Sequence, residues 1–205
     1  MKYLNALNPL KSQDETNRLS KILNAGDYYC ATDSRTLLAI PKKYFNEPIE
    51  SSNDVPDISF IFSLKRLSIP LTYTIHEIRE AYELIPKTPD HNDCEQCDGW
   101  GKINCSCCDS EIECKSCNGS GEGELNGEFY YDSEYALKFD ESYISTDSVG
   151  KLVDVFINLD LMSDQEVILI SCDKDKPLIF EIGDILFVTV PTHNDFIPED
   201  KRIIL

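Results

Sequence analysis

Four cysteines in two close pairs constrain this 205-residue chain more than any other feature of its sequence. Cys94 pairs with Cys97 and Cys114 with Cys117, and sixteen residues separate the two pairs. Two residues between the thiols of a pair let both sulfurs reach one metal ion, and two pairs complete a closed tetrahedral shell. The spacing therefore predicts one structural Zn²⁺ ion bound by these four residues.

Glycines follow each pair at the same positions, so both segments read C-x-x-C-x-G-x-G. Because glycine adopts positive φ, backbone amides can fold back toward the sulfurs and offset the thiolate charge. This unit resembles the zinc-binding cysteine-rich region of DnaJ-type chaperones, over Cys94–Gly121 only. That family carries four such repeats and two metal ions. The His-Pro-Asp signature of the J-domain does not occur here, so the resemblance implies a zinc lobe and excludes a complete co-chaperone.

A third cysteine group, Cys105-Ser-Cys107-Cys108, lies between the two pairs and lacks the glycines. Cys105 and Cys108 are candidates for an accessory metal role. Three interpretations remain open: the group caps the zinc site, exchanges with its ligands, or holds a second ion with His91. Since a closed site needs two full ligand pairs, we expect a single zinc ion.

Disulfides and a redox C-x-x-C pair are the alternatives to zinc. The N-terminal sequence has no apolar segment of the signal-peptide type, which favours a reducing cytoplasm. No βαβ pattern of the thioredoxin type surrounds the cysteines. The remaining two, Cys30 and Cys172, lie in apolar segments and are expected to be small buried side chains.

Charge limits the function further. The chain has 37 acidic and 19 basic residues, a net charge of −18. This argues against a protein that binds nucleic acid mainly by neutralising phosphates. Short basic pairs at positions 42–43, 65–66 and 201–202 are typical of solvated surface. No apolar run approaches the roughly 20 residues of a membrane-spanning helix, so no membrane partner is expected.

The N-terminal part predicts helices and strands. A capping-box pattern starts at Ser12, and apolar residues at helical spacing continue toward Gly26, so we expect a helix over residues 13–25. Tyr28–Pro41 predicts two strands joined by a tight turn. A polar stretch predicts a loop over 47–57, an apolar run predicts a strand over 58–64, and helical spacing predicts a helix over 74–85 that Pro86 ends.

Residues 89–128 have a different composition, rich in cysteine, glycine and acid and nearly free of aliphatic side chains. Such a segment cannot build a core without metal. We therefore expect a zinc-binding insertion at 89–128 between two halves of one domain, 1–88 and 129–205.

The C-terminal part predicts strands at 129–131 and 135–139, then a helix over 146–158 with Thr146 as its N-cap. Three strands are expected at 166–171, 177–182 and 185–191, with Gly183-Asp184 as the last turn. Each half thus has a helix, then apolar strands that meet at a short turn, then an aliphatic-proline ending.

This repeated helix and strand meander resembles the half-unit of DNA sliding clamps. The second half is similar to a bacterial β-clamp domain in Tyr143-Ile144 before its helix and in the Pro-led strand, Gly/Asp turn and final strand of 176–191. The first half contributes Ala31-Thr-Asp-Ser-Arg35, similar to the Ala-Thr-Asp-Gly-x-Arg stretch of clamp domains, with Ser34 for the glycine and a spacing one residue shorter. A clamp-like domain interrupted by a C-x-x-C-x-G-x-G loop also resembles a class of phage and mobile-element proteins.

The resemblance implies an α+β fold, a clamp-like domain of two helix-plus-strand-meander halves with the zinc-knuckle lobe inserted. A generic α+β domain is the alternative. The expected core combines helical spacing with apolar strand runs: Leu19, Ile22, Leu23, Leu38, Ile40, Leu152, Val153, Phe156, Ile168, Ile170, Phe180, Phe187 and Val190.

Two non-enzymatic functions follow. The first is a clamp-like accessory of DNA replication, or a clamp mimic, whose partners are replication proteins and, through a homo-oligomer, duplex DNA. The second is a zinc-knuckle, chaperone-like interaction module with no role on nucleic acid. No catalytic motif occurs, and His76, His91 and His193 are expected to be surface residues rather than catalytic ones. The expected location is the cytoplasm of a bacterium or of a phage-infected host.

Overall fold

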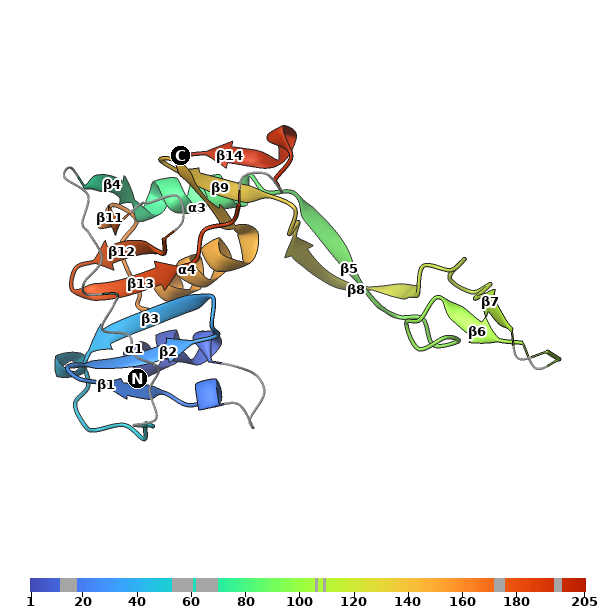
Figure 1. The fold of residues 1–205 in the computed structure, drawn as a ribbon, viewed down its shortest axis with the longest axis horizontal. Coiled ribbons are helices and arrows are strands. Elements are labelled where there is room, and N and C mark those ends of the chain that lie inside the picture. The colour runs from blue at the N-terminus through green and yellow to red at the C-terminus, as the bar shows by residue number, and fades with distance from the viewer. Residues whose placement is uncertain are drawn as a thin grey trace. The chain divides into compact units, whose positions relative to one another are not determined.

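A computed structural model describes residues 1–11, 18–52, 61, 70–105, 107–108, 110–171, 176–193 and 197–205. The chain forms two compact units. We call Met1–Ile85 with Ser133–Leu205 the body, and Pro86–Asp132 the lobe (Figure 1). Helices and mostly antiparallel strands occur together, so the predicted α+β class is confirmed.

A seven-stranded antiparallel sheet in the order β1-β2-β3-β13-β12-β11-β4 forms the main part of the body. Two three-stranded meanders, β1-β2-β3 and β11-β12-β13, meet at its centre, where β3 pairs with β13 (Figure 1). The strands are β1 (Leu23–Ala25), β2 (Tyr28–Thr32), β3 (Thr36–Pro41), β4 (Leu71–Thr74), β11 (Glu166–Ser171), β12 (Leu178–Ile182) and β13 (Ile185–Thr189).

Each meander is preceded by a helix, α1 (Lys2–Leu7) before β1 and α4 (Thr146–Asn158) before β11. The prediction of two similar halves is therefore confirmed. Helix α4 packs against both α1 and α3 (Ile75–Glu83). A smaller sheet, β10-β9-β14, completes the body. Its strands are β9 (Ala136–Phe139), β10 (Ser142–Ser145) and β14 (Arg202–Ile204). In the described part of the chain, 3₁₀ turns occur at Asn8–Leu10, Arg18–Ser20, Lys42–Tyr44 and Glu199–Lys201.

The helix predicted over 13–25 is wrong where the structure describes it. Residues 18–20 form a 3₁₀ turn and Leu23–Ala25 is strand β1, and the first half takes its helix from Lys2–Leu7 instead. Gly26, at φ +60°, is the first residue of a two-residue hairpin turn, since Ala25 pairs with Tyr28. The spacing of Leu19, Ile22 and Leu23 suits one face of a helix. A 3₁₀ turn followed by a short strand accommodates the same spacing, so the apolar pattern did not distinguish the two.

Most of the other predicted elements are confirmed. Strands β2 and β3 flank the predicted turn, α3 begins with a full capping box at Thr74, and α4 occupies 146–158 as expected. The N-cap of α4 is Ser145 rather than Thr146, because the Ser145 hydroxyl accepts the Ser148 N–H. Of the strand predicted over 58–64 the structure describes only Ile61, which is buried and helical.

The core of the body lies on both faces of the sheet. One face gathers Leu37, Ala39 and Val188 with Ile61 in a single apolar cluster. On the other face Phe180 contacts Phe139 of β9, with ring centroids 5.1 Å apart. Ten of the thirteen predicted core residues are buried; Leu19 and Ile168 are half-buried, and Val190 is 51% exposed, so its assignment was wrong. Cys30 is buried as predicted, whereas Cys172 lies outside the described residues.

The lobe contains two antiparallel two-stranded sheets. Strand β5 (Lys87–Asp93) pairs with β8 (Glu122–Tyr131), and β6 (Lys102–Asn104) pairs with β7 (Glu111–Glu113). Its apolar cluster is made of cysteines with Ile103 packed against them. In the part of the chain that the structure describes, no helix has the length and apolar character needed to cross a membrane.

Candidate metal centre

The first C-x-x-C-x-G-x-G segment begins where β5 ends and folds into a tight double turn. The Cys97 N–H donates to the Cys94 carbonyl at 3.1 Å, and the Trp100 N–H donates to the Cys97 carbonyl at 3.0 Å. Asp98, Gly99 and Gly101 all have positive φ, between 49° and 79°. This backbone path brings the Gly101 N–H to 3.2 Å from the Cys97 sulfur, where it can stabilise a thiolate.

The second segment repeats this geometry twenty residues later. Asn118, Gly119 and Gly121 have φ between 50° and 83°, the same pattern as in the first segment. The Gly121 N–H lies 3.2 Å from the Cys117 sulfur. The shared C-x-x-C-x-G-x-G motif therefore produces the same pattern of positive φ in both segments, as the repeated spacing predicted.

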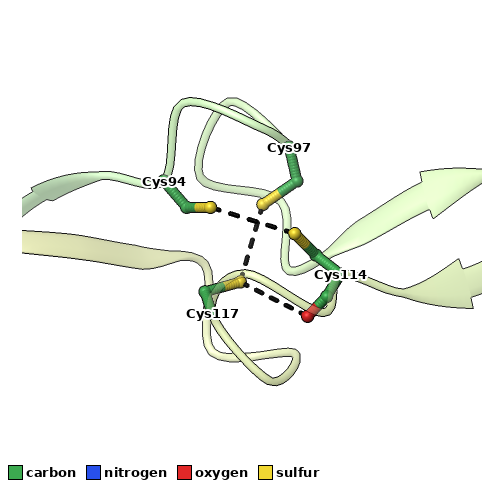
Figure 2. A group of neighbouring side chains, drawn as sticks. All are labelled: Cys94, Cys97, Cys114 and Cys117. Carbon is green, nitrogen blue, oxygen red and sulfur yellow. Dashed lines mark hydrogen bonds between the residues drawn. The ribbon is translucent and has the colours of Figure 1, made fainter.

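The four thiols of the two segments converge on one point (Figure 2). The sulfurs of Cys94 and Cys114 are 3.9 Å apart, those of Cys97 and Cys117 are 3.8 Å apart, and all four lie within 4.8 Å of one another. Thiolates at the usual Zn–S distance in a tetrahedron would be about 3.8 Å apart. The arrangement could therefore hold a tetrahedrally coordinated metal ion without rearrangement.

Backbone contacts between the segments hold the two turns together. The Cys94 N–H donates to the Gly121 carbonyl, and the Cys114 N–H donates to the Gly101 carbonyl, each at 2.8 Å. The chains approach so closely that a Cβ on Gly101 would lie 2.2 Å from the Gly119 oxygen, and a Cβ on Gly121 would lie 2.1 Å from the Gly99 oxygen. The last glycine of each repeat is thus required by the pairing of the two turns as well as by its own φ.

The thiols influence one another electrostatically. Burial, together with hydrogen bonds to the neighbouring thiols, raises the pKa of Cys97 to about 12. Burial also acts on Cys117, but the Gly121 N–H and the neighbouring thiols outweigh it and lower the pKa of Cys117 to about 7. One thiol of the group ionises readily and its charge then opposes ionisation of another, so a fully ionised cluster needs a cation.

The surroundings of the cluster are acidic. The lobe contains eleven acidic residues and three lysines. Beside Cys94, a cavity of about 720 Å³ is lined by four carboxylate residues, Asp93, Glu95, Glu122 and Glu124. This negative field favours a cation at the thiols and disfavours the approach of nucleic acid phosphates.

The third cysteine group forms a separate cluster at the tip of the β6–β7 hairpin. The sulfurs of Cys105, Cys107 and Cys108 lie within 4.8 Å of one another, and the first two are 2.8 Å apart. None of them joins the four-thiol cluster in this structure. His91 is not in the group among the described residues, and its Nδ1 lies 3.2 Å from the Gly123 carbonyl.

The other sequence candidates lie on the surface. His76 is exposed next to Glu80, 3.4 Å away, and His193 is exposed as well. Lys43 forms an ion pair with Asp184, and Lys201 forms one with Glu134 at 3.4 Å. The basic pair at 65–66 lies outside the described residues.

One ionic cluster of the body was not predicted. Lys151 on α4 donates to Asp33 at 2.6 Å and to Asp147 at the same distance, and so ties the second half to the β2–β3 turn of the first. Burial opposes ionisation of Asp33, but Lys151 and the N–H groups of the turn outweigh it and lower the pKa of Asp33 to about 2. The sequence predicted the tight turn that contains Asp33, whereas the lysine partner of Asp33, 118 residues away, was not predicted.

Comparisons with known proteins find similarity in structure alone. No protein-family model matches the chain, and no curated protein does. A protein from Eubacterium rectale, assigned as a DNA polymerase III β subunit, superposes with a TM-score of 0.51 and 11% identity, over 97% of this chain and 64% of that one. This likeness shows that the chain has a sliding-clamp-like fold.

Two further clamps are similar at lower scores. The Helicobacter pylori β clamp bound to a DNA ligase peptide has a TM-score of 0.48 and 13% identity, over 93% of this chain and 62% of that one. The Thermotoga maritima β subunit has a TM-score of 0.47 and 11% identity, over 97% and 65%. The chain therefore spans somewhat less than two thirds of the clamps it matches.

Proposed function

We propose that this chain is a sliding-clamp-related protein of DNA replication, that it is not an enzyme, and that it works through protein partners. The observation that carries the proposal is the repeated helix-plus-meander unit of the body, in a fold shared with a DNA polymerase III β subunit. Fold alone does not determine function, so the surface chemistry of the body decides between encircling DNA and binding proteins.

The charges on the helices favour protein partners. Exposed positions of α3 carry three glutamates and one arginine, and α4 carries Asp147, Asp154 and Lys151. Lys151 is paired with two aspartates, and Lys2 of α1 donates to the Leu159 carbonyl. Holding duplex DNA requires lysine and arginine aimed at phosphates. Together, helices α1, α3 and α4 carry more acidic than basic residues, and their two lysines, Lys2 and Lys151, bind other groups of the protein.

We further propose that Cys94, Cys97, Cys114 and Cys117 hold one structural Zn²⁺ in an insertion at 89–128, between the clamp-like halves 1–88 and 129–205. The sulfur spacing and the N–H groups directed at two of the sulfurs support this assignment. Four thiolates leave no open coordination position for water or substrate, so the ion would contribute folding energy and no catalysis. The proposed location is the cytoplasm of a bacterium or of a phage-infected host.

Three measurements on the full chain test the clamp-related function. Light scattering gives the oligomeric state and separates a ring from a single chain. A pull-down against replication proteins is expected to capture a partner, while duplex DNA binding over a salt series is expected to be weak and to fall steeply with salt. Submicromolar, sequence-selective DNA binding by the monomer would contradict the proposal.

A second candidate function is a protein-interaction module in the lobe, of the chaperone-like kind. The observation that favours it is the exposure of large apolar side chains there: Trp100 is 83% exposed, Phe129 64% and Leu125 61%. Exposed apolar groups of this size are common at protein-binding surfaces. The test is whether the chain binds unfolded polypeptides. Binding that becomes weaker in Trp100→Ala and in Phe129→Ala would favour this function over the clamp-related one.

A further inference from the structure

The cysteine group at the β6–β7 tip is separate from the four-thiol cluster, and the hairpin brings its three thiols close together. Strands β6 and β7 pair up to Asn104 opposite Glu111, and the Cys105 N–H continues the ladder by donating to the Ser110 carbonyl at 2.8 Å. The hairpin thus holds Cys105, Cys107 and Cys108 in one short reversal. Cys107 and Cys108 are exposed.

We propose that Cys105, Cys107 and Cys108 form a second metal site, a three-thiolate site for a soft monovalent cation, copper(I). The three sulfurs lie within 4.8 Å of one another, close enough for each to reach one ion. Exposed free thiols are otherwise avoided on protein surfaces because they oxidise and cross-link. Two exposed thiols and one half-buried thiol on a single hairpin tip form a ligand set.

The donor set selects the ion. Among the described residues, this group contains sulfur ligands alone, with no carboxylate or imidazole. Magnesium and calcium require oxygen ligands, whereas thiolates suit copper(I), zinc and iron–sulfur clusters. Structural zinc and iron–sulfur clusters take four protein ligands, so a set of three thiolates favours copper(I). Binding needs the sulfurs of Cys105 and Cys107 to move apart from their separation of 2.8 Å. The three thiols release their protons as the ion binds.

The site is independent of the clamp-related function and of the zinc-ligand set. No sulfur belongs to both clusters, so copper(I) at the tip and a tetrahedral ion at the four-thiol cluster can be held together. The two sites differ in ligand number and exposure: the four-thiol cluster has three buried cysteines, and the tip has two exposed ones.

The experiment is an anaerobic titration of the reduced, zinc-loaded full chain with copper(I), in competition with a chromophoric copper(I) chelator. We expect the wild-type chain to take up one copper(I) and to keep its zinc. The variant Cys105→Ser/Cys107→Ser/Cys108→Ser should take up none while its zinc content is unchanged, which also shows that its lobe is folded. Ser110→Ala, which removes only the hydroxyl 3.0 Å from the Cys108 sulfur, should bind copper as the wild type does.

X-ray absorption of the copper-loaded chain should report three sulfur neighbours. The proposal is overturned if the triple variant binds as much copper(I) as the wild type, if zinc is released as copper enters, or if the copper has only two sulfur ligands. If the chain takes up a second equivalent of zinc, and this zinc prevents copper(I) from binding at the tip, the choice of copper(I) is also overturned.

Discussion

Strand β3 of the body and strand β8 of the lobe differ in how much of each strand is buried, and so in how each unit is stabilised. All six residues of β3 are buried, whereas eight of the ten residues of β8 are exposed. The body is stabilised by apolar side chains packed on both faces of a sheet, and burying each large one contributes about 1.5–3 kcal/mol. Among its described residues the lobe has no such layer, and its buried side chains are mainly the cysteines themselves.

The contrast predicts that this chain combines a core that tolerates chemical change with a lobe that depends on a single centre. In the body, loss of one side chain leaves many contacts in place. In the lobe, the backbone hydrogen bonds between the two C-x-x-C turns depend on the same residues that converge on the metal position. Variants of each unit test this difference, from the largest expected effect to the smallest.

Removing two thiols should unfold the lobe and leave the body folded. In the variant Cys94→Ser/Cys97→Ser we expect loss of about one equivalent of zinc, because structural zinc binding supplies about 10–16 kcal/mol of folding energy to small domains. Hydrogen exchange should become fast in Pro86–Asp132 and stay slow in the strands of the body. Cys107→Ser, outside the four-thiol cluster, is the control and should keep its zinc. Loss of the whole far-UV signal together with the metal would show that the lobe is integral to the body.

A core truncation should have the reverse effect. Phe187 is fully buried in β13, and Phe187→Ala should destabilise the body by about 3–5 kcal/mol in a denaturant titration. Val190→Ala is the matched control, since Val190 is 51% exposed and should change stability by less than about 0.5 kcal/mol. Zinc affinity should be the same in both variants. A loss of zinc from Phe187→Ala under conditions in which the variant is folded would argue that the body and the lobe are not stabilised separately.

Two glycines of nearly equal φ separate backbone strain from packing in the lobe. Gly121 (φ +83°) lies against the Gly99 carbonyl, whereas a Cβ on Gly127 (φ +84°) would have no atom within 4 Å. Gly121→Ala should push the two turns apart and weaken zinc binding about 10–100-fold, as loss of outer-shell support does elsewhere. Gly127→Ala should cost only about 1 kcal/mol of local strain and leave zinc affinity unchanged. Equal zinc affinities in a chelator competition would refute the packing argument.

The Lys151–Asp33 ion pair should make the body sensitive to acid. The pKa of Asp33 is lowered to about 2 in the folded chain, so the folded state favours the carboxylate. The resulting stability is complete above the ordinary carboxyl pKa and is lost as the pH falls through about 2. Lys151→Met should lower stability at pH 7 by about 1–2 kcal/mol, a value reduced for partial exposure.

The pH profile distinguishes this pair from simple packing. The difference in unfolding free energy between wild type and Lys151→Met should narrow between about pH 4 and pH 2, as Asp33 takes up its proton. Lys151→Arg, which keeps the charge, serves as the control. A difference that is constant over this range would mean that the lysine stem, rather than its charge, stabilises the helix.

The smallest effect is expected at Ser34. This residue has φ +81° in the β2–β3 turn, at the position where the resembling clamp stretch has glycine. Ser34→Gly should stabilise the body by about 0.5–1 kcal/mol, because glycine adopts positive φ without strain. Thermal unfolding would measure this. The hydrogen bond from the Ser34 N–H to the Thr32 hydroxyl is kept in this variant. A destabilised variant would therefore show that the extra backbone entropy of glycine in the unfolded chain outweighs the relief of strain.

The repeated C-x-x-C-x-G-x-G unit was sufficient to predict the candidate metal centre. Its ligand spacing and glycine positions are local, so the turn geometry follows from eight residues whose φ values repeat in both copies. The contacts between copies, such as Cys94 to Gly121, were not visible in the sequence because they depend on how two turns pack. The separation of the tip cysteines from the four-thiol cluster was decided by the length of the β6–β7 hairpin.

In the body, elements with strong local signals could be read directly. Helix α4 has seven buried residues at helical spacing, and the turn at Asp33-Ser34 has its own hydrogen-bonding chemistry. The segment at Leu23–Ala25 has no comparable local signal, since its apolar residues suit a helix as well as a strand. Only pairing with β2 determined that it is a strand.

The sequence alone therefore determined the four converging thiols, the acidic character of the chain and most of its helices and strands, because each depends on residues close together in the chain. The tertiary structure alone decided that β3 pairs with β13, which joins two meanders into one sheet, and that Lys151 reaches Asp33. It also placed the helix of the first half at Lys2–Leu7. These features rest on contacts between distant residues, whose burial and pairing no local pattern encodes.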